Sequence, residues 1–433
     1  MSYFIIAKPN NMLMKTILLV LLLAGSLHAS AQNWPNWRGP DQNGISSATG
    51  IVDSWSETKN VLWKIPLTDR GGSTPVVWGN RIFLTAAEAG KNTVHAYDKT
   101  TGKELWKVHV GKQDPGEHKK GSGANPSAVT DGKHVWAYFK SGDVTCIDVA
   151  GKTVWTRNLA KELEGDSYSD DALWWDLGTS PILTKSHLVI TVMVSGPSFL
   201  LALDPKTGKK AWRAERNLDV NDESNQSYTT PVLAEKDGKE MIFTVGADYI
   251  TAHDAATGKE LWRAGGLNPT NHQYFRLISS PVIAGDLVIA PHARGKNTMA
   301  FKMVGEGDVT TSGLVWNKDG GSDVPSPAYQ DGKLYFLGDK GYLSCVDAAT
   351  GEEKWGHQIK KSSKAYSASP VLVDGKIVLL REDGLAIVGQ ETDSGFEEIS
   401  QNQLDAATYA TPVATDGTLL IRSNGHLYCI GKK

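Results

Sequence analysis

The sequence predicts an all-β fold, an eight-bladed β-propeller whose blades are four-stranded antiparallel sheets. Two independent markers recur through the 433 residues at spacings of roughly 40 to 57 residues, the range typical of propellers and solenoids. Between the markers, short apolar runs alternate with Asp-Gly and Thr-Gly turns, and no stretch has a long helical period. Four such strands repeated eight times predict small twisted sheets arranged around a channel.

The first marker is an Asp-x-x-Thr-Gly turn followed by a tryptophan, as in "AYDKTTGKELW" (Ala96–Trp106). The aspartate can bind its own turn backbone and the glycine supplies a positive φ, so the phrase predicts the hairpin between the third and fourth strands. We expect the large ring to fill the wedge between neighbouring blades. In a degenerate unit, Ile399 takes this place. The structural tryptophans are Trp63, Trp106, Trp155, Trp212, Trp262, Trp316 and Trp355.

The second marker is a Ser/Thr-Pro pair that opens an apolar run. Proline at the first position of a strand costs no ladder hydrogen bond, so the pair predicts the start of the innermost strand of each blade. Asn125-Pro126 completes this set of eight. The other pairs are Thr74-Pro75, Ser180-Pro181, Thr230-Pro231, Ser280-Pro281, Ser326-Pro327, Ser369-Pro370 and Thr411-Pro412.

The two ends of the chain are expected to build the eighth blade together. Trp63 lies in a fourth-strand phrase with no three strands before it, whereas the C-terminus supplies three strands with no fourth. We therefore predict that Val61–Ile65 pairs with Leu427–Ile430, which removes the exposed edge of an open array. Residues 60–433 are assigned to the propeller and residues 32–59 to an N-terminal extension.

Residues 1–31 are predicted to be a secretory signal peptide. Lys15 precedes the apolar run "TILLVLLLAGSL", and small residues lead to a cleavage site near Ala31. The run is too short for a comfortable membrane span. We expect the mature protein in the periplasm or outside the cell. Three single cysteines, Cys146, Cys345 and Cys429, share one repeat position with alanines, which favours buried inert thiols over a bridge or ligand role.

Composition excludes several function classes. The formal net charge of −3 gives no drive toward nucleic acid or anionic lipid. Metal-ligand spacings and nucleophile motifs are absent from the sequence. The segment "DVNDESNQSYTT" has Ser224 and Thr230 where a calcium loop needs glycine and glutamate. We predict no catalytic residue and no metal ligand.

The phrase Ala-x-Asp-x-x-Thr-Gly-Lys-x-x-Trp resembles the repeat of pyrroloquinoline-quinone (PQQ) dehydrogenases and of their non-enzymatic, BamB-like relatives. The opening "WPNWRGPDQNGIS" (Trp34–Ser46) is similar to the start of secreted PQQ-like repeat proteins. The resemblance implies an eight-bladed propeller with tryptophans docked between blades. The dehydrogenases also imply a vicinal cysteine pair and a calcium ion beside the quinone. This chain has no adjacent cysteines, so the resemblance does not carry the activity over.

The candidate site lies on the face formed by the interblade loops, which are long before Pro126, Pro181, Pro231 and Pro281, and by the loops between second and third strands, which carry His292, Arg294 and Arg381. Trp174 and Trp175 fall outside the repeat position. They form either an aromatic platform for a sugar, a planar ring or a partner side chain, or a hydrophobic plug that holds the loop over the channel. The remaining candidates could converge into a polar pocket with a cationic side, suited to carboxylates and phosphates. They are Asp176, Tyr228, His272, Tyr274, Arg276, His292, Arg294 and Arg381.

Two functions remain open from the sequence. The favoured one is a non-catalytic, monomeric propeller that binds a protein partner or a carbohydrate-like ligand through its loop-rich face, without a cofactor. The alternative is a PQQ-dependent oxidoreductase acting on an alcohol or sugar, with PQQ over Trp174 and Trp175 and with calcium.

Overall fold

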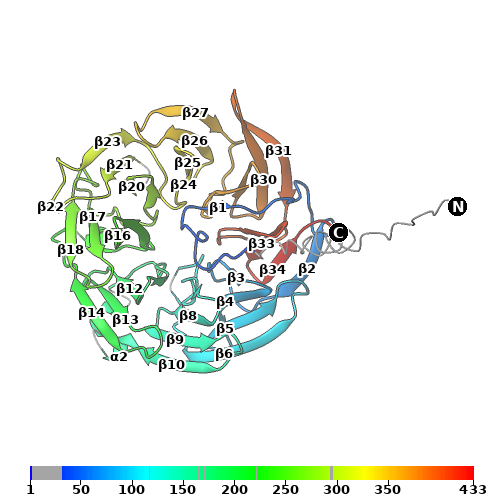
Figure 1. The fold of residues 1–433 in the computed structure, drawn as a ribbon, viewed down its shortest axis with the longest axis horizontal. Coiled ribbons are helices and arrows are strands. Elements are labelled where there is room, and N and C mark those ends of the chain that lie inside the picture. Colours follow the sequence, from blue (N-terminus) through cyan, green and yellow to red (C-terminus); the bar gives the residue numbers. More distant parts are fainter. Residues whose placement is uncertain (2–31, 117, 163–164, 170–171, 221, 293–295) are drawn as a thin grey trace. The chain divides into compact units, whose positions relative to one another are not determined.

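The computed structural model describes residues 1, 32–116, 118–162, 165–169, 172–220, 222–292 and 296–433. Residues 32–433 form one compact unit of eight β-sheets around a common centre (Figure 1), so the predicted eight-bladed propeller is confirmed. The predicted signal peptide lies outside the described residues except for Met1. Within the described ranges, the structure contains no helix with the length and apolar character needed to cross a bilayer.

The first four blades follow one another along the chain, each with its innermost strand first. Blade 1 comprises β3 (Val76–Trp78), β4 (Arg81–Glu88), β5 (Lys91–Asp98) and β6 (Glu104–Lys112); blade 2 comprises β7 (Val129–Thr130), β8 (His134–Tyr138), β9 (Asp143–Asp148) and β10 (Thr153–Asn158); blade 3 comprises β11 (Ile182–Leu183), β12 (Leu188–Val192), β13 (Phe199–Leu203) and β14 (Lys210–Glu215); blade 4 comprises β15 (Val232–Lys236), β16 (Lys239–Gly246), β17 (Tyr249–Asp254) and β18 (Glu260–Ala264), with β22 (Gly307–Asp308) added in parallel.

The last four blades have the same order, and three short helices lie in the loops between blades 2, 3 and 4. Blade 5 comprises β19 (Val282–Ala284), β20 (Leu287–His292), β21 (Asn297–Lys302) and β23 (Leu314–Asp319); blade 6 comprises β24 (Ala328–Gln330), β25 (Lys333–Leu337), β26 (Tyr342–Asp347) and β27 (Glu353–Gln358); blade 7 comprises β28 (Val371–Val373), β29 (Lys376–Leu380), β30 (Leu385–Thr392) and β31 (Gly395–Gln403); blade 8 comprises β32 (Val413–Thr415), β33 (Thr418–Ser423), β34 (His426–Ile430) and β2 (Val61–Pro66); the helices are α2 (Leu159–Glu162), η1 (Gly165–Tyr168) and η2 (Asp222–Asn225).

The two ends of the propeller close the ring in blade 8. Strand β2 pairs antiparallel with β34, with Val61 opposite Ile430 and Ile65 opposite Leu427, which confirms the predicted pairing. The outermost strand of blade 8 therefore comes from the N-terminal side and its three inner strands from the C-terminal side. No edge is left between the first and last repeats.

The tryptophan of one blade packs against the turn glycine of the next blade, so the first and last parts of the repeated phrase contact each other between blades. Trp63 of blade 8 lies against Gly102 of blade 1, where an added Cβ would come within 2.8 Å of the indole ring. The indole Nε1 donates to the carbonyl oxygen of Lys99 in the same turn, at 2.9 Å. Gly102 also has a φ of 71°, so the turn requires glycine for two separate reasons. The same contact recurs in the pairs Trp106–Gly151, Trp155–Gly208, Trp212–Gly258 and Trp316–Gly351.

Blade 7 lacks this tryptophan, and the prediction that Ile399 replaces it is wrong by one residue. Ile399 is exposed on β31, and Ser400 pairs with Val388 in the register that the tryptophans occupy elsewhere. A buried tryptophan comes from the N-terminal extension instead. Trp55 belongs to the same core cluster as Val388 and Cys429, at the junction of blades 7 and 8.

The N-terminal extension, residues 32–59, crosses the centre of the ring, a placement that the sequence did not predict (Figure 1). Trp34 forms an isolated bridge with Val77 of blade 1. Arg38 donates to the carbonyl oxygen of Ser326 at the start of blade 6, at 2.9 Å. Strand β1 (Ile45–Ser46) pairs in parallel with β28 of blade 7. The extension therefore ties together the innermost strands of blades far apart in the sequence.

Candidate functional site

The strand order gives the propeller two faces. Connections between blades, and between second and third strands, lie on what we call the loop face; the two short turns of each blade lie on the turn face. The long interblade loops contact one another on the loop face. The ring of His118 stands edge-on to that of Trp175, with centroids 5.6 Å apart. Farther along, the backbone N–H of Glu223 donates to Gln273 O at 3.1 Å.

A ring of hydroxyl groups surrounds the channel where the innermost strands begin. The backbone N–H of Ser180, for example, donates to Thr230 Oγ1 of the next blade at 3.0 Å. This contact occurs at seven of the eight blade junctions and gives the second sequence marker its structural role. We call the set the hydroxyl girdle. It consists of Thr74, Ser127, Ser180, Thr230, Ser280, Ser326, Ser369 and Thr411.

The girdle corrects the register predicted for blade 2. Ser127 accepts the N–H of Thr74 at 2.9 Å and lies two residues before β7, as Ser180 lies two residues before β11. Asn125-Pro126 is therefore displaced by two residues from the position assigned to it. The hydroxyl group is the shared feature of the marker, because the position after Ser127 is alanine rather than proline.

Six of the eight girdle residues, all except Thr74 and Ser326, line a small cavity of about 160 Å³ in the centre of the ring. Trp37 of the N-terminal extension contributes to its wall, and every blade contributes at least one residue. None of the described residues in this wall carries a formal charge. They are Trp37, Gly72, Asn125, Ser127, Gly178, Ser180, Tyr228, Thr230, Ile278, Ser280, Val324, Ser367, Ser369, Tyr409 and Thr411.

Trp174 and Trp175 lie on the loop before blade 3 and are exposed by 39% and 48%. Their backbone is nevertheless held firmly. The N–H of Trp174 donates to Gln226 Oε1 at 3.0 Å, and the N–H of Trp175 donates to the hydroxyl of Tyr228 at 3.2 Å. The indole Nε1 of Trp175 donates to Glu223 Oε1 at 2.6 Å. The pair is thus an anchored, solvent-facing aromatic surface.

The hydrophobic plug of this loop is made by other residues. Leu173 and Leu177 are buried and pack into the core cluster shared by blades 2 and 3. Asp176 follows the tryptophans with a φ of 70° and is fully buried. Its carboxylate accepts the N–H of His118 at 3.0 Å and lies 3.4 Å from Lys140 Nζ. A left-handed aspartate therefore turns the chain inward and leaves the tryptophans outside.

A chain of charges continues from Trp175 around the rim. Arg276, on the loop before blade 5, lies 3.7 Å from Glu223 Oε1 through its Nε atom. Its Nη1 donates to Asp323 Oδ1 at 3.2 Å. Burial, together with the charge of Asp323, raises the pKa of Asp339 to about 6. Glu223 and Asp323 therefore already balance the positive charge of Arg276.

The other predicted residues lie in separate environments. His292 is buried, and its Nε2 is 2.8 Å from Asp248 Oδ1. Arg381 makes two hydrogen bonds to the carboxylate of Asp383, at 2.8 and 3.0 Å. His272 and Tyr274 are exposed on the loop that carries Arg276, and His272 stacks on Phe275 with centroids 4.1 Å apart. Arg294 lies outside the described residues.

The structure thus connects Trp174, Trp175, Tyr228 and Arg276 through two residues that the sequence analysis did not select, Gln226 and Glu223. Both lie in the acidic segment that was weighed only as a calcium loop. Glu223 and Gln226 differ from ordinary loop residues because they are buried next to the tryptophan pair of the preceding loop. The sequence does not show burial, so it could not single them out.

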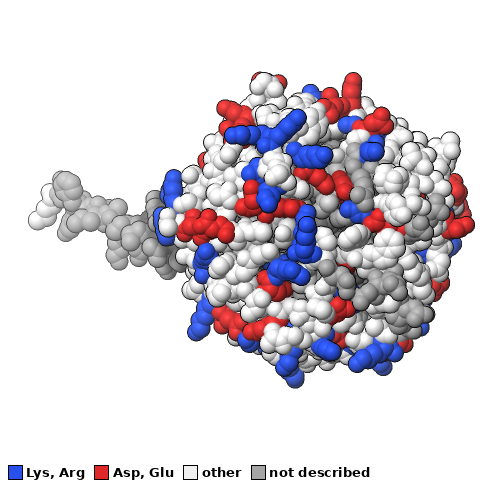
Figure 2. Space-filling model, turned by 180° about the vertical axis from the view of Figure 1, so that it is seen from behind, with Lys and Arg blue, Asp and Glu red and all other residues white. Residues whose placement is uncertain are grey.

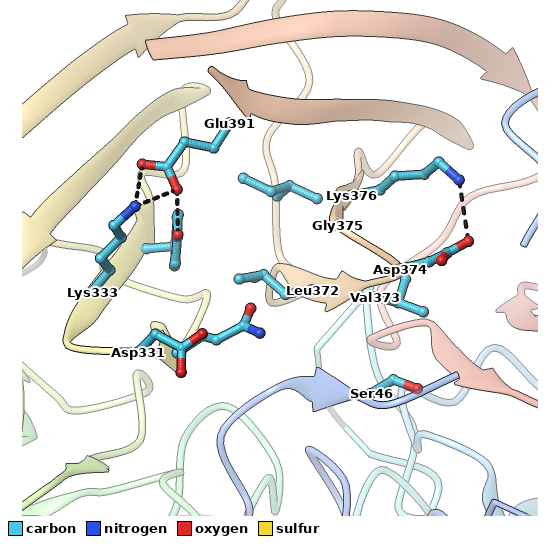
Figure 3. Close-up of a pocket in the computed structure, with 12 residues that line it drawn as sticks. Ser46, Asp331, Lys333, Leu372, Val373, Asp374, Gly375, Lys376 and Glu391 are labelled. Atoms are coloured by element: carbon cyan, nitrogen blue, oxygen red, sulfur yellow. Dashed lines mark hydrogen bonds and ion pairs between the residues drawn. The ribbon is translucent and has the colours of Figure 1, made fainter. Parts of the chain in front are cut away.

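A larger pocket of about 300 Å³ lies on the turn side, between blades 6 and 7, and contains none of the predicted residues. Figure 3 shows Lys333 facing Glu391 on one wall, whereas Lys376 turns away toward Asp374. Ser46 of the extension lines the pocket as well. The two lysines are paired with carboxylates, so this pocket offers no free cation among its described residues.

The surface charge is mixed. On the face seen in Figure 2, Lys and Arg side chains alternate with Asp and Glu, and neither sign covers a broad area. This face therefore does not present the continuous basic surface that binds polyanions.

The sequence model of the family described as "Outer membrane protein assembly factor BamB" matches residues 45–188, 90–357 and 302–430. Together these matches span nearly the whole propeller. The chain belongs to this family of PQQ-like propellers. No curated protein sequence matches it.

Solved structures with this fold include BamB and two dehydrogenases. BamB from Moraxella catarrhalis is 16% identical, with a TM-score of 0.61 over 86% of this chain and 99% of that one. A europium-containing methanol dehydrogenase is 12% identical, with a TM-score of 0.69 over 93% of this chain and 98% of that one. The quinohemoprotein alcohol dehydrogenase from Comamonas testosteroni is 13% identical, with a TM-score of 0.65 over 94% and 82%. At these identities the likeness establishes the fold alone.

The described residues of this PQQ-like propeller do not fit a quinone tricarboxylate and its metal ion. The channel cavity, at about 160 Å³, is smaller than the several hundred Å³ usual for sites of drug-sized ligands. Arg276 and Arg381 are already paired with carboxylates. Among the described residues, no three His, Cys, Asp or Glu side chains gather to hold a metal. The three cysteines are free and buried, and burial raises the pKa of Cys146 to about 12.

Proposed function

We propose that this PQQ-like propeller is a non-catalytic scaffold that binds a protein partner through exposed aromatic residues of its loop face. We call the surface formed by Trp174, Trp175, His272 and Tyr274 the aromatic rim. The observation that carries the proposal is that Trp174 and Trp175 stay exposed by 39% and 48% although hydrogen bonds hold their backbone in place. Tryptophan and tyrosine dominate the binding energy of protein interfaces.

Anchoring supports recognition because an ordered side chain loses less entropy on binding. Gln226 Oε1 accepts from both Trp174 N and the Tyr228 hydroxyl, and Tyr228 in turn accepts from Trp175 N. The rim is therefore organised before a partner arrives. The family description, which names an outer membrane protein assembly factor, supports a partner in the cell envelope. We also propose that residues 1–31 direct secretion and are removed near Ala31, which would place the protein in the same compartment as such a partner.

The decisive experiment is site-specific photo-crosslinking in the cell envelope. A benzophenone side chain placed at Trp175 is expected to yield one discrete protein adduct. Trp78, exposed by 37% at the end of β3 near the turn face, is the matched control and is expected to yield none. The same adducts from both positions, or none from Trp175, would refute the proposal.

Affinity and activity measurements separate the alternatives. The Trp174→Ala/Trp175→Ala variant should bind the purified partner at least about tenfold more weakly, since interface tryptophans contribute on the order of 2 kcal/mol or more. Its melting temperature should fall only modestly, because the substitution removes the hydrogen bond from Trp175 Nε1 to Glu223 but leaves the backbone anchors and the core in place. Tryptophan quenching by oligosaccharides, with no protein adduct, would instead favour a carbohydrate-like ligand. Dye-linked alcohol or sugar oxidation after addition of PQQ and calcium would favour the oxidoreductase.

A further inference from the structure

The hydroxyl girdle contains hydrogen-bond donors that no described protein atom accepts. Seven girdle oxygens accept a backbone N–H, but none of these hydroxyls donates to an acceptor among the described residues. Thr74 Oγ1 has no partner within the same ranges. All eight side chains belong to residues that are at most 4% exposed. Polar groups buried to this degree are normally hydrogen bonded, so the girdle implies an acceptor inside the channel.

Asn125 adds another donor to the wall of the same cavity. Its Oδ1 accepts the N–H of Gly72 at 3.2 Å and that of Ser122 at 2.9 Å. These two contacts fix the orientation of the amide, because Nδ2 could not accept them. The Nδ2 group therefore remains as a donor. No aspartate or glutamate lies among the described residues of the cavity wall to repel a negative ligand.

A buried cation lies against the girdle. Arg38 is 1% exposed and donates to the carbonyl oxygens of Ser326, a girdle residue, and Pro327. No carboxylate of the described residues forms an ion pair with it, and its Nε has no partner there. Burial lowers the pKa of Arg38 to about 9, which leaves the guanidinium charged at neutral pH. A charge buried without a counter-ion is costly.

We propose that the central channel binds a small inorganic anion, a halide or an oxyanion of nitrate size, inside the hydroxyl girdle and above Trp37. Such an anion accepts the girdle hydrogens, and Arg38, which is not among the described wall residues, supplies a positive charge close to the girdle through its contact with Ser326. The cavity of about 160 Å³ holds it together with a few water molecules. Water alone can accept the hydrogens but adds no negative charge near the buried guanidinium of Arg38. The anion would also join the N-terminal extension to all eight blades.

The test begins with the protein in gluconate buffer, since gluconate is much larger than bromide or nitrate. Bromide, nitrate and phosphate are then exchanged in at constant ionic strength while the melting temperature is followed. A saturable rise with bromide or nitrate is expected, because a ligand that binds only the folded state stabilises it by mass action. Crystals soaked in bromide should place an anomalous scattering peak within the girdle.

Asn125→Asp is the most informative variant. The aspartate keeps an oxygen for Gly72 N and Ser122 N, so the loop is preserved, but it replaces a donor with a negative charge in the cavity wall. Bromide affinity should fall at least about tenfold through charge repulsion. Asn217→Asp is the matched control, because its Oδ1 also accepts one backbone N–H, from Ser198 at 2.8 Å, on an exposed loop outside the cavity.

Three outcomes would overturn the proposal: no saturable effect of any of the three anions, unchanged bromide affinity in Asn125→Asp, or a bromide peak outside the channel. If Asn125→Asp fails to fold, the bromide position in wild-type crystals decides. A channel that contains only water in those crystals counts against the proposal. The photo-crosslinking result at Trp175 is independent of all these measurements, so the two proposals fail separately.

Discussion

Arg422 and Asp69 form a buried ion pair across the junction of the last and first blades. The Nη2 atom of Arg422, on β33, lies 2.6 Å from Asp69 Oδ1, and the two side chains are exposed by only 0% and 6%. Arg422 also donates to the carbonyl oxygen of Thr85 on β4 at 2.9 Å. The hydroxyl girdle makes its regular contact at the other seven junctions, whereas Thr74 Oγ1 is left without a partner among the described residues here. At the junction where the ring closes, the Arg422–Asp69 ion pair therefore connects the two blades in place of the girdle hydrogen bond.

Removing one partner of this pair should destabilise the whole ring. Asp69→Asn leaves the guanidinium of Arg422 buried without its counter-ion, and such changes cost about 3–5 kcal/mol. Urea denaturation followed by tryptophan fluorescence measures the loss. The exposed pair Lys185–Glu235 is the control, and Glu235→Gln should change stability by less than about 1 kcal/mol. Equal effects of the two substitutions would mean that Arg422 does not hold the junction.

The contact between Gly102 and Trp63 predicts a difference between two glycines of similar backbone conformation. Gly102 has a φ of 71° and Gly90 a φ of 76°, so alanine at either position pays the same backbone cost of about 1–2 kcal/mol. A Cβ at Gly102 also meets the indole of Trp63 at 2.8 Å, whereas a Cβ at Gly90 meets nothing within 4 Å. Gly102→Ala should therefore lower the melting temperature clearly more than Gly90→Ala. Matching shifts would show that the turn alone, and not the docking, requires glycine.

The pairing of β2 with β34 predicts that the C-terminus is indispensable. Deletion from Pro412 onward removes β32, β33 and β34, leaves β2 without a partner and exposes the apolar faces of blades 1 and 7 that pack against blade 8. The truncated chain should aggregate or melt at a much lower temperature in light scattering and calorimetry. Deletion of only Lys432 and Lys433, both exposed, is the control. A soluble truncation with an unchanged melting curve would contradict the two-ended blade.

The sequence was sufficient for the architecture because the repeated residues act locally and at fixed spacing. The tryptophan phrase and the hydroxyl marker both gave eight units, and β2 was paired correctly with β34. Ile399 was misplaced by one residue because the hairpin turn of blade 7 is shorter, with Thr392 already paired to Gly395. Asn125-Pro126 was misplaced by two residues because no proline follows Ser127.

The candidate site was less predictable because it depends on long-range partners. Arg276 was expected on the cationic side of a pocket for carboxylates or phosphates, whereas Glu223 and Asp323 come from two other loops and pair with it. The extension lies outside the repeats, so the repeat pattern could not predict that it passes through the ring or that Arg38 contacts Ser326. Trp174 and Trp175 were correctly singled out as lying outside the repeat, but only the geometry distinguishes an anchored exposed pair from a plug.

Buried His253 predicts a specific loss of stability in mild acid. Its ring is fully buried on β17 between Gly258 O and Thr251 Oγ1, and desolvation lowers its pKa from 6.5 to about 4. The unfolded chain takes up a proton below pH 6.5 and the folded chain only near pH 4, so stability is lost as the pH falls through this window. The loss is on the order of 3 kcal/mol. His253→Gln should flatten the pH dependence of the unfolding free energy between pH 6.5 and 4, and His109→Gln, at an exposed position on β6, is the control substitution. A His253→Gln profile parallel to that of the wild type would show that this imidazole is already charged in the folded protein.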